Sequence, residues 1–197
     1  MKDWIKKLNP RNWVELSSPI TLGFAALSLL ALVLGALTGG ASTLALFSVY
    51  RSSPSNPLFY LRLFLHPLGH ASFAHFTGNM ALLLVLGPMV EKQYGARRLV
   101  LMMLLTALIT SLAHLLLSPG TMALGASGLV FMLILLSAAS GGTGGKIPLT
   151  LLLVAIIYLG QELAGGLLKT DSVSQLAHLI GGLCGMAFGL IYQPAKK

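Results

Sequence analysis

A serine and a histidine each stand within an apolar stretch of this chain, where reactive polar side chains are unusual. Ser127 lies in the run Gly125-Ala126-Ser127-Gly128, and His178 follows Ala177 in a second apolar run. Polar groups at membrane depth are costly, so their presence indicates a function. A hydroxyl nucleophile activated by an imidazole is one chemistry that these residue types support. Burial disfavours the imidazolium, which leaves the neutral base that this chemistry needs.

The surroundings of Ser127 fit this chemistry but also have a simpler explanation. Gly125 and Gly128 flank the serine at the predicted external end of its segment. Small neighbours allow close backbone approach, and a helix N-terminus there would present free N–H groups to a developing oxyanion. Taken alone, a serine at this place also fits an ordinary N-cap. His178 favours the functional interpretation, because it also falls near the predicted external end of its segment.

The histidine is followed by a stripe of glycines. Gly181 and Gly185 lie three and seven residues after His178 and share its helical face. With Gly189 they form a small-xxx-small pattern that lets another helix approach closely. Many membrane helices pack in this way, and a lone histidine can simply bridge two helices. The combination of the histidine and the glycine stripe indicates a functional site more specifically than either feature alone.

A second group of polar residues precedes the second apolar segment. His75 and Asn79 are four residues apart, so they share one helical face, and both can donate to an oxyanion. His66 and His70 are expected to order the preceding loop or line the rim of a wet cavity. Close histidines also suggest a metal site, but no carboxylate or thiolate accompanies them and no His-Glu-x-x-His pattern occurs. We therefore expect no metal and no other cofactor.

No acidic residue is well placed to orient the histidine. Glu162 ends the fifth apolar segment and Asp171 lies in a predicted loop, so a Ser–His dyad is favoured over a triad. His114 is expected to pack between helices or lie at the membrane interface. Cys184, the single cysteine, is expected to be a small buried thiol.

Composition identifies the setting of these residues as a membrane. Of the 197 residues 55% are hydrophobic and 9% are charged, against roughly 25% charged in soluble domains. Runs near the ~20 residues that span a bilayer predict an all-α protein with six transmembrane helices. The predicted spans are Pro19–Leu37, about Ser72–Met89, Leu99–Leu117, Met122–Ala139, Ile147–Leu163 and Val173–Tyr192.

The basic residues set the predicted topology. Ten of the thirteen fall before the first span, between spans two and three, between four and five, or after the sixth. The positive-inside rule then places both termini in the cytoplasm. The net charge of +8 is thus a topology signal rather than a nucleic-acid surface. The absence of a transit-like leader favours a prokaryotic cell membrane.

The domain organisation follows from these spans. Residues 1–18 form a cytoplasmic segment that either lies on the membrane surface or is disordered. Residues 19–193 form one six-helix domain, and residues 194–197 a cytoplasmic tail. A long external connection at about residues 38–71 contains apolar clusters, which predict a structured excursion that dips into the membrane. Oligomeric state stays open, because the glycine stripe can serve internal packing alone.

Together these residues resemble the rhomboid family of intramembrane serine proteases. The resemblance covers about residues 58–192 and combines the four histidine and asparagine positions from 66 to 79, the Gly125–Gly128 run, and Ala177-His178 with its glycines. It implies a six-helix rhomboid-like bundle with a water-filled cavity open to the outside. It further implies that Ser127 attacks a peptide bond in or near the transmembrane segment of a membrane-protein substrate, with His178 as base. The side chains of His75 and Asn79 and the Ser127 N–H would hold the oxyanion, and a movement of the fifth span would admit the substrate from lipid.

Two positions depart from the family pattern. A Trp-Arg pair that usually anchors the external loop is Leu61-Arg62 here, and the aromatic that usually stacks on the catalytic histidine is Phe131 in place of tyrosine. Phenylalanine keeps the ring and loses the hydroxyl, so the orientation of His178 is expected to be looser. The alternatives are a catalytically inactive rhomboid-like binder of transmembrane helices, and a small transporter or channel that uses the histidines.

Overall fold

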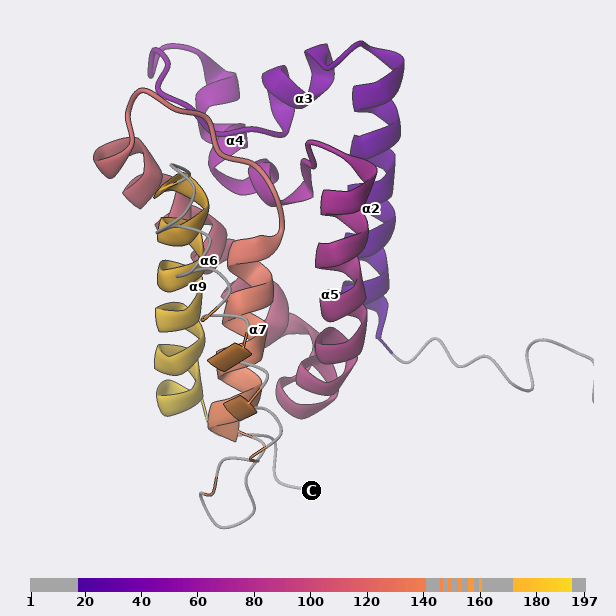
Figure 1. Cartoon of the computed structure of the whole chain (residues 1–197), viewed down its shortest axis with the longest axis vertical. Coiled ribbons are helices and arrows are strands. Elements are labelled where there is room, and N and C mark those ends of the chain that lie inside the picture. The colour runs from indigo at the N-terminus through magenta and orange to yellow at the C-terminus, as the bar shows by residue number, and fades with distance from the viewer. Residues whose placement is uncertain are drawn as a thin grey trace, which may run out of the picture.

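A computed structural model gives the fold of residues 18–140 and 172–192, with isolated positions 146, 149, 152–153, 156–157 and 160 between them. Within these residues every regular element is a helix, and one antiparallel bridge joins Val49 to Ala123. Figure 1 shows the helices side by side, with α3 and α4 across one end. In chain order they are α2 (Pro19–Leu37), α3 (Ala41–Leu46), α4 (Pro57–Leu65), η2 (His66–Leu68), α5 (Phe73–Tyr94), α6 (Ala96–Leu117), α7 (Ser127–Ser140) and α9 (Ser172–Ile191).

Three of these helices, α2, α5 and α6, are long and apolar enough to cross a membrane. Helices α7 and α9 carry shorter apolar stretches. The prediction of an all-α membrane bundle is therefore confirmed. The first predicted span matches α2 at both ends, and the sixth matches α9 to within one residue. The fifth, Ile147–Leu163, falls mostly outside the described residues, as do residues 1–17 of the N-terminal segment and the whole tail.

Two predicted boundaries were wrong. Helix α5 continues five residues beyond Met89 to Tyr94, and α6 begins at Ala96, so the expected gap between Met89 and Leu99 shrinks to Gly95, whose φ is +85°. Helix α7 begins at Ser127 rather than at Met122. The residues before it run as an extended segment that pairs with Val49, and Gly125 turns the chain with a φ of +118°.

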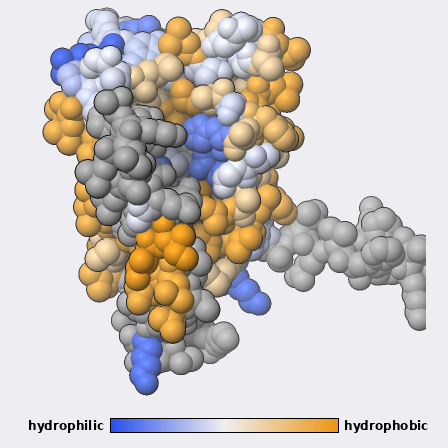
Figure 2. Space-filling view, in the orientation of Figure 1, coloured by the Kyte–Doolittle hydropathy of each residue, from blue (hydrophilic) through white to orange (hydrophobic). Residues whose placement is uncertain are grey.

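The outer surface of the helices is apolar. Leu37, Val85 and Leu190 are each more than 70% exposed, and many other large apolar side chains lie open on the same helices. Figure 2 shows many apolar side chains over the visible face, with hydrophilic residues gathered at the corner near α4 and in a smaller patch in the middle of the face. Such a continuous apolar surface is what a lipid solvent requires.

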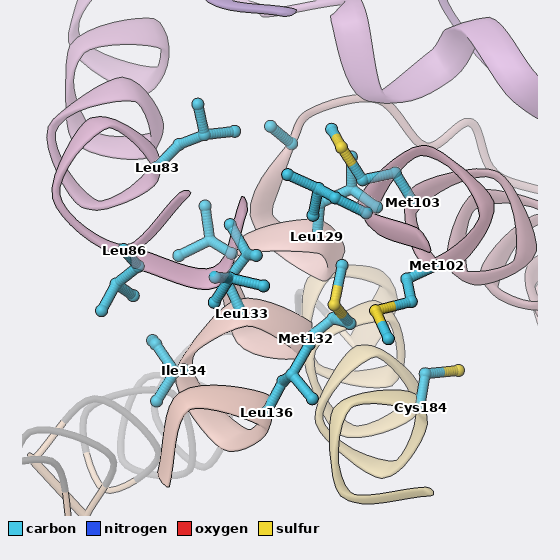
Figure 3. Close-up of a cluster of buried hydrophobic side chains, with 14 of the residues drawn as sticks. Leu83, Leu86, Met102, Met103, Leu129, Met132, Leu133, Ile134, Leu136 and Cys184 are labelled. Atoms are coloured by element: carbon cyan, nitrogen blue, oxygen red, sulfur yellow. The ribbon is translucent and has the colours of Figure 1, made fainter. Parts of the chain in front are cut away.

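Helix α7 lies at the centre of the bundle. Val130, Phe131 and Met132 are fully buried, as are residues on the remaining faces of the same helix. A helix that is apolar all round is a core helix. Figure 3 shows its side chains meeting Leu83 and Leu86 of α5, Met102 and Met103 of α6, and Cys184 of α9. Cys184 is buried and free, as predicted.

The N-terminus of α2 is fastened by a carboxylate from α5. Glu91 accepts the N–H of Ile20 (3.0 Å), the N–H of Thr21 (3.0 Å) and the Thr21 hydroxyl (2.8 Å). A negative charge at a helix N-terminus is favourable, and these bonds satisfy N–H groups that have no partner within the helix. At Gly87, one turn earlier on α5, an added Cβ would lie 2.5 Å from the Thr21 side chain. The small residue and the acid together hold α2 against α5.

The connection between α2 and α5 is structured, as its apolar clusters predict. Arg62 on α4 is buried, lies with its guanidinium 4.3 Å from the Tyr50 ring centroid, and donates to Ser52 Oγ (2.8 Å) and the Tyr50 hydroxyl. Helix α4 packs on α6, and η2 packs on α2. As a result, His66 at the start of η2 lies in the interior of the bundle.

Candidate functional site

Ser127 is the first residue of the central helix α7. The N–H groups in the first turn of a helix have no partner within it, so the Ser127 amide is open to an acceptor. The turn before the serine is fixed at both sides. Val49 and Ala123 exchange backbone hydrogen bonds of 2.8 and 2.9 Å, and the N–H of Gly125 donates to the carbonyl of His66 at 3.0 Å. Two contacts with the connection between α2 and α5 therefore position the start of α7.

Helices α7 and α9 pack through glycine, and they form the most extensive helix pair in the described structure. A Cβ at Gly181 would collide with the carbonyl oxygen of Gly128, and one at Gly185 with the carbonyl oxygen of Met132. A Cβ at Gly128 would lie 3.3 Å from the carbonyl oxygen of Ala177. The glycine stripe on α9 thus packs as the sequence predicts. The residue after Ser127 meets the residue before His178.

The Phe131 ring lies stacked on the imidazole of His178. Their centroids are 4.4 Å apart and their planes differ by 16°. Both side chains are buried. Phe131 follows Ser127 by four residues and shares its face of α7, so it holds the imidazole beside the N-terminal turn of that helix. A hydrogen bond from Ser127 to His178 stays a prediction, and so do the catalytic roles of both residues.

On the other side of the serine, Gly125 lies directly against His75. A Cβ at Gly125 would lie 2.7 Å from Cε1 and 2.8 Å from Nε2 of that imidazole, and 3.8 Å from Nδ2 of Asn79. Asn79 is 3% exposed, and its Nδ2 has no hydrogen-bond partner among the residues whose placement is described. A buried amide with a vacant donor costs stability unless a ligand uses it. The two predicted oxyanion donors therefore converge on the loop that precedes Ser127.

These groups surround a cavity of about 250 Å³. Its wall includes Ser127, His75, Gly125, Gly128 and Ala177. His178 and Asn79 lie behind this wall and are not part of its lining within the described structure. Ser127 thus lines the cavity itself. Of His178 and Asn79, only neighbouring residues such as Ala177 and His75 line it.

The far wall of the cavity is also polar, and it contains two further histidines. His66 Nδ1–H donates to Ser111 Oγ (3.1 Å), because the Ser111 hydroxyl itself donates to the Leu63 carbonyl (2.9 Å). Burial, with a smaller contribution from His114, lowers the pKa of His66 from 6.5 to about 4, so this ring is neutral at pH 7. His66 was expected to order the loop or line a wet rim, and it lines the cavity.

His114, which was expected to pack between helices or to lie at the interface, is buried, and it also forms part of the cavity wall. Its Nε2–H donates to the Thr121 carbonyl at 3.2 Å, and only 4% of the residue is exposed. The sequence does contain a signal for this position. Thr106, Thr110 and His114 recur every four residues on α6, which predicts one polar stripe along an otherwise apolar helix.

His70 lies at the edge of this group. Its Nδ1–H donates to the Leu68 carbonyl (3.1 Å), and its ring meets the His75 ring edge to face at 5.1 Å. Burial, and next the neighbouring His75, lowers the pKa of His70 to about 4. Among the described residues, no three His, Cys, Asp or Glu side chains lie close enough together to hold a metal ion.

The fold and the site define an all-α membrane bundle with a partly polar cavity at one end of its central helix. A family model described as the rhomboid domain matches residues 58–195, from α4 through α9. This match covers more than half of the chain, and the chain therefore belongs to the rhomboid family. No curated protein matches it.

Proposed function

We propose that this chain is an intramembrane serine endopeptidase that cleaves membrane proteins in or near a transmembrane segment. The observation that carries the proposal is the joint placement of Ser127 and His178. Gly128 packs on Ala177 and Gly181, while Phe131 lies flat on the imidazole. Both contacts hold the N-terminal parts of α7 and α9 together, and this packing supports a pairing of the two residues whose chemistry is complementary.

In the proposed reaction, the Ser127 Oγ attacks the scissile carbonyl carbon while its proton passes to His178. The carbonyl oxygen becomes an oxyanion, and the C–N bond then breaks as His178 returns the proton to the leaving amine. Water attacks the resulting ester, again with His178 as base, and releases the acid and the free serine. The chemistry needs no cofactor.

The proposed oxyanion hole has three donors. The Ser127 N–H is open at the first turn of α7, the His75 ring faces the Gly125 loop, and the vacant Nδ2 of Asn79 lies behind it. Donors fixed in a low-dielectric site stabilise the transition state because they need no reorganisation when charge develops. Each side-chain donor is expected to contribute about 10²–10³ in rate.

The size of the cavity restricts the form of the substrate. An α-helix with its side chains is about 10–12 Å across. A cavity of about 250 Å³ accepts a few residues of an extended chain and excludes an intact helix. Substrates are therefore expected to be membrane proteins whose transmembrane helix unwinds readily at the cleavage site. The proposed setting is a cell membrane with both termini of the enzyme in the cytoplasm.

The test is cleavage of a transmembrane reporter by purified protein in detergent or liposomes. Wild-type protein should produce fragments and react with a fluorophosphonate probe, and Ser127→Ala should do neither. His178→Ala should also be inactive. Asn79→Ala should retain probe binding while its rate falls by about 10²–10³.

The opposite results would identify another function. Helix binding without cleavage, and without reaction of Ser127 with the probe, would indicate an inactive rhomboid-like binder. Cleavage that persists in Ser127→Ala would exclude the proposed mechanism.

A further inference from the structure

A second hollow opens on the lipid-facing side of the bundle, away from Ser127. It lies between the first half of α2 and the first half of α6, and it measures about 350 Å³. Gly23, Phe24 and Leu27 line one side, and Val100 and Leu104 line the other. All of these side chains are apolar, and the hollow is called the α2–α6 groove below.

The length of the α2–α6 groove matches one leaflet of a bilayer. Its wall on α2 runs from Pro19 to Leu27, which at 1.5 Å per residue is about 12 Å. Half of a typical hydrocarbon core is about 15 Å. At the inner end the groove is closed by Phe64, Leu65, Pro67 and Leu68 from α4 and η2. A chain entering from the membrane surface would stop at this floor, near the middle of the bilayer.

A basic residue precedes the groove lining on α6 by about one helical turn. Arg97 is exposed and lies three residues before Val100 and seven before Leu104, so all three share one face of α6. The nearby acid, Glu91, is buried, and its oxygens are occupied by Ile20 and Thr21. The mouth therefore presents a positive charge to the membrane surface from which α2 and α6 start.

We propose that the α2–α6 groove binds an anionic glycerophospholipid, with one acyl chain between the helices and the phosphate on Arg97. In the predicted topology this lipid belongs to the cytoplasmic leaflet, which is where anionic headgroups attract basic residues near the surface. The acyl chain would touch the floor beside His66, whose carbonyl accepts the Gly125 N–H. A bound lipid would thus brace the connection that positions the start of α7.

The test uses native mass spectrometry of the full chain in detergent, with equal amounts of dioleoyl phosphatidylglycerol and phosphatidylcholine. Gly23→Leu is the filling variant, because no heavy atom lies within 4 Å of a Cβ at Gly23 and leucine is a better helix former than glycine. Its matched control is Ala26→Leu, at an exposed position of α2 outside the groove lining. Arg97→Gln removes the charge. Its control is Arg98→Gln, where the guanidinium lies 5.7 Å from the Tyr192 ring centroid, at a different face.

Wild-type protein and both controls are expected to retain one phosphatidylglycerol in preference to phosphatidylcholine. Arg97→Gln should reduce that preference about fivefold, which is the effect of one basic residue near a charged surface. Gly23→Leu should lose both lipids, and added phosphatidylglycerol should no longer raise its thermal unfolding midpoint.

Three results would overturn the proposal. The first is lipid retention in Gly23→Leu equal to that of wild type. The second is equal binding of the two lipids with no change in Arg97→Gln. The third is a wild-type dimer that Gly23→Leu converts to monomer, which would assign the groove to a second copy of the chain.

Discussion

Replacing Gly125 by alanine should slow the proposed protease strongly without changing a reacting group. Two independent features of the structure require glycine at this position. The backbone φ is +118°, a region that residues with a side chain rarely adopt. In addition, the new Cβ would lie 2.7 Å from Cε1 and 2.8 Å from Nε2 of His75. Either the loop before Ser127 or the imidazole must move.

The effects on stability and on the cleavage rate can be estimated separately. A residue held in an unfavourable φ region costs about 1–3 kcal/mol, which a folded bundle tolerates. Relief of the contact requires a displacement on the order of 1 Å, and misplacing a catalytic group by that distance costs about 10² in rate. We therefore expect kcat to fall about 100-fold, with a thermal unfolding midpoint lowered by only several degrees.

The assay is reporter cleavage by the purified variant, with thermal unfolding measured on the same preparation. Gly120→Ala is the matched control, because it lies in the same loop between α6 and α7, has no positive φ and has no heavy atom within 4 Å of its Cβ. The control should cleave at the wild-type rate. Full activity in Gly125→Ala would show that His75 and this loop do not form the transition-state site.

Three further predictions concern packing, capping and pH. Phe131→Leu keeps an apolar side chain but removes the ring stacked on His178, so the cleavage rate should fall about tenfold, within the 0.5–1.5 kcal/mol of an aromatic pair, while Phe131→Tyr stays active. Glu91→Gln replaces an acceptor by an amide donor facing Thr21, and unfolding measurements should show a loss of about 2 kcal/mol at unchanged kcat per folded molecule. The pKa of His66 is about 4 when folded and 6.5 otherwise, so the unfolded state binds more protons between these values. The contribution of His66 to stability should therefore be full above pH 6.5 and be lost, by about 3 kcal/mol, towards pH 4, and His66→Gln should remove this part of the pH profile.

The elements that the sequence predicted well are those set by local composition. The first span could be placed to the residue because Pro19 begins it and Gly39-Gly40 follow it. The glycine pattern after His178 predicted a close helix contact because its spacing alone puts the small residues on one face. Neither inference required knowledge of what lies elsewhere in the chain.

The errors arose where distant residues decide the local structure. Met122 to Leu124 are as apolar as the helix that follows, yet they are extended because Ala123 pairs with Val49, more than 70 residues earlier. His114 could be placed on a helix from its sequence, but only the packing of α6 against the rest of the bundle turns it towards the cavity. Such pairings and rotations depend on long-range contacts that no short window of sequence contains.

Some glycines are required for the fold whether or not the chain is a protease. A correctly folded bundle is therefore no evidence of catalysis. Gly181 and Gly185 are needed for α7 and α9 to approach, whether or not Ser127 reacts. Gly125 differs from them, because its neighbour is the His75 imidazole rather than another helix backbone. A purely structural bundle would gain nothing from holding a half-buried imidazole against a loop that only glycine can form, whereas an oxyanion site requires it. Selective loss of activity at Gly125, with stability largely kept, would therefore separate a working protease from an inactive relative of the same fold.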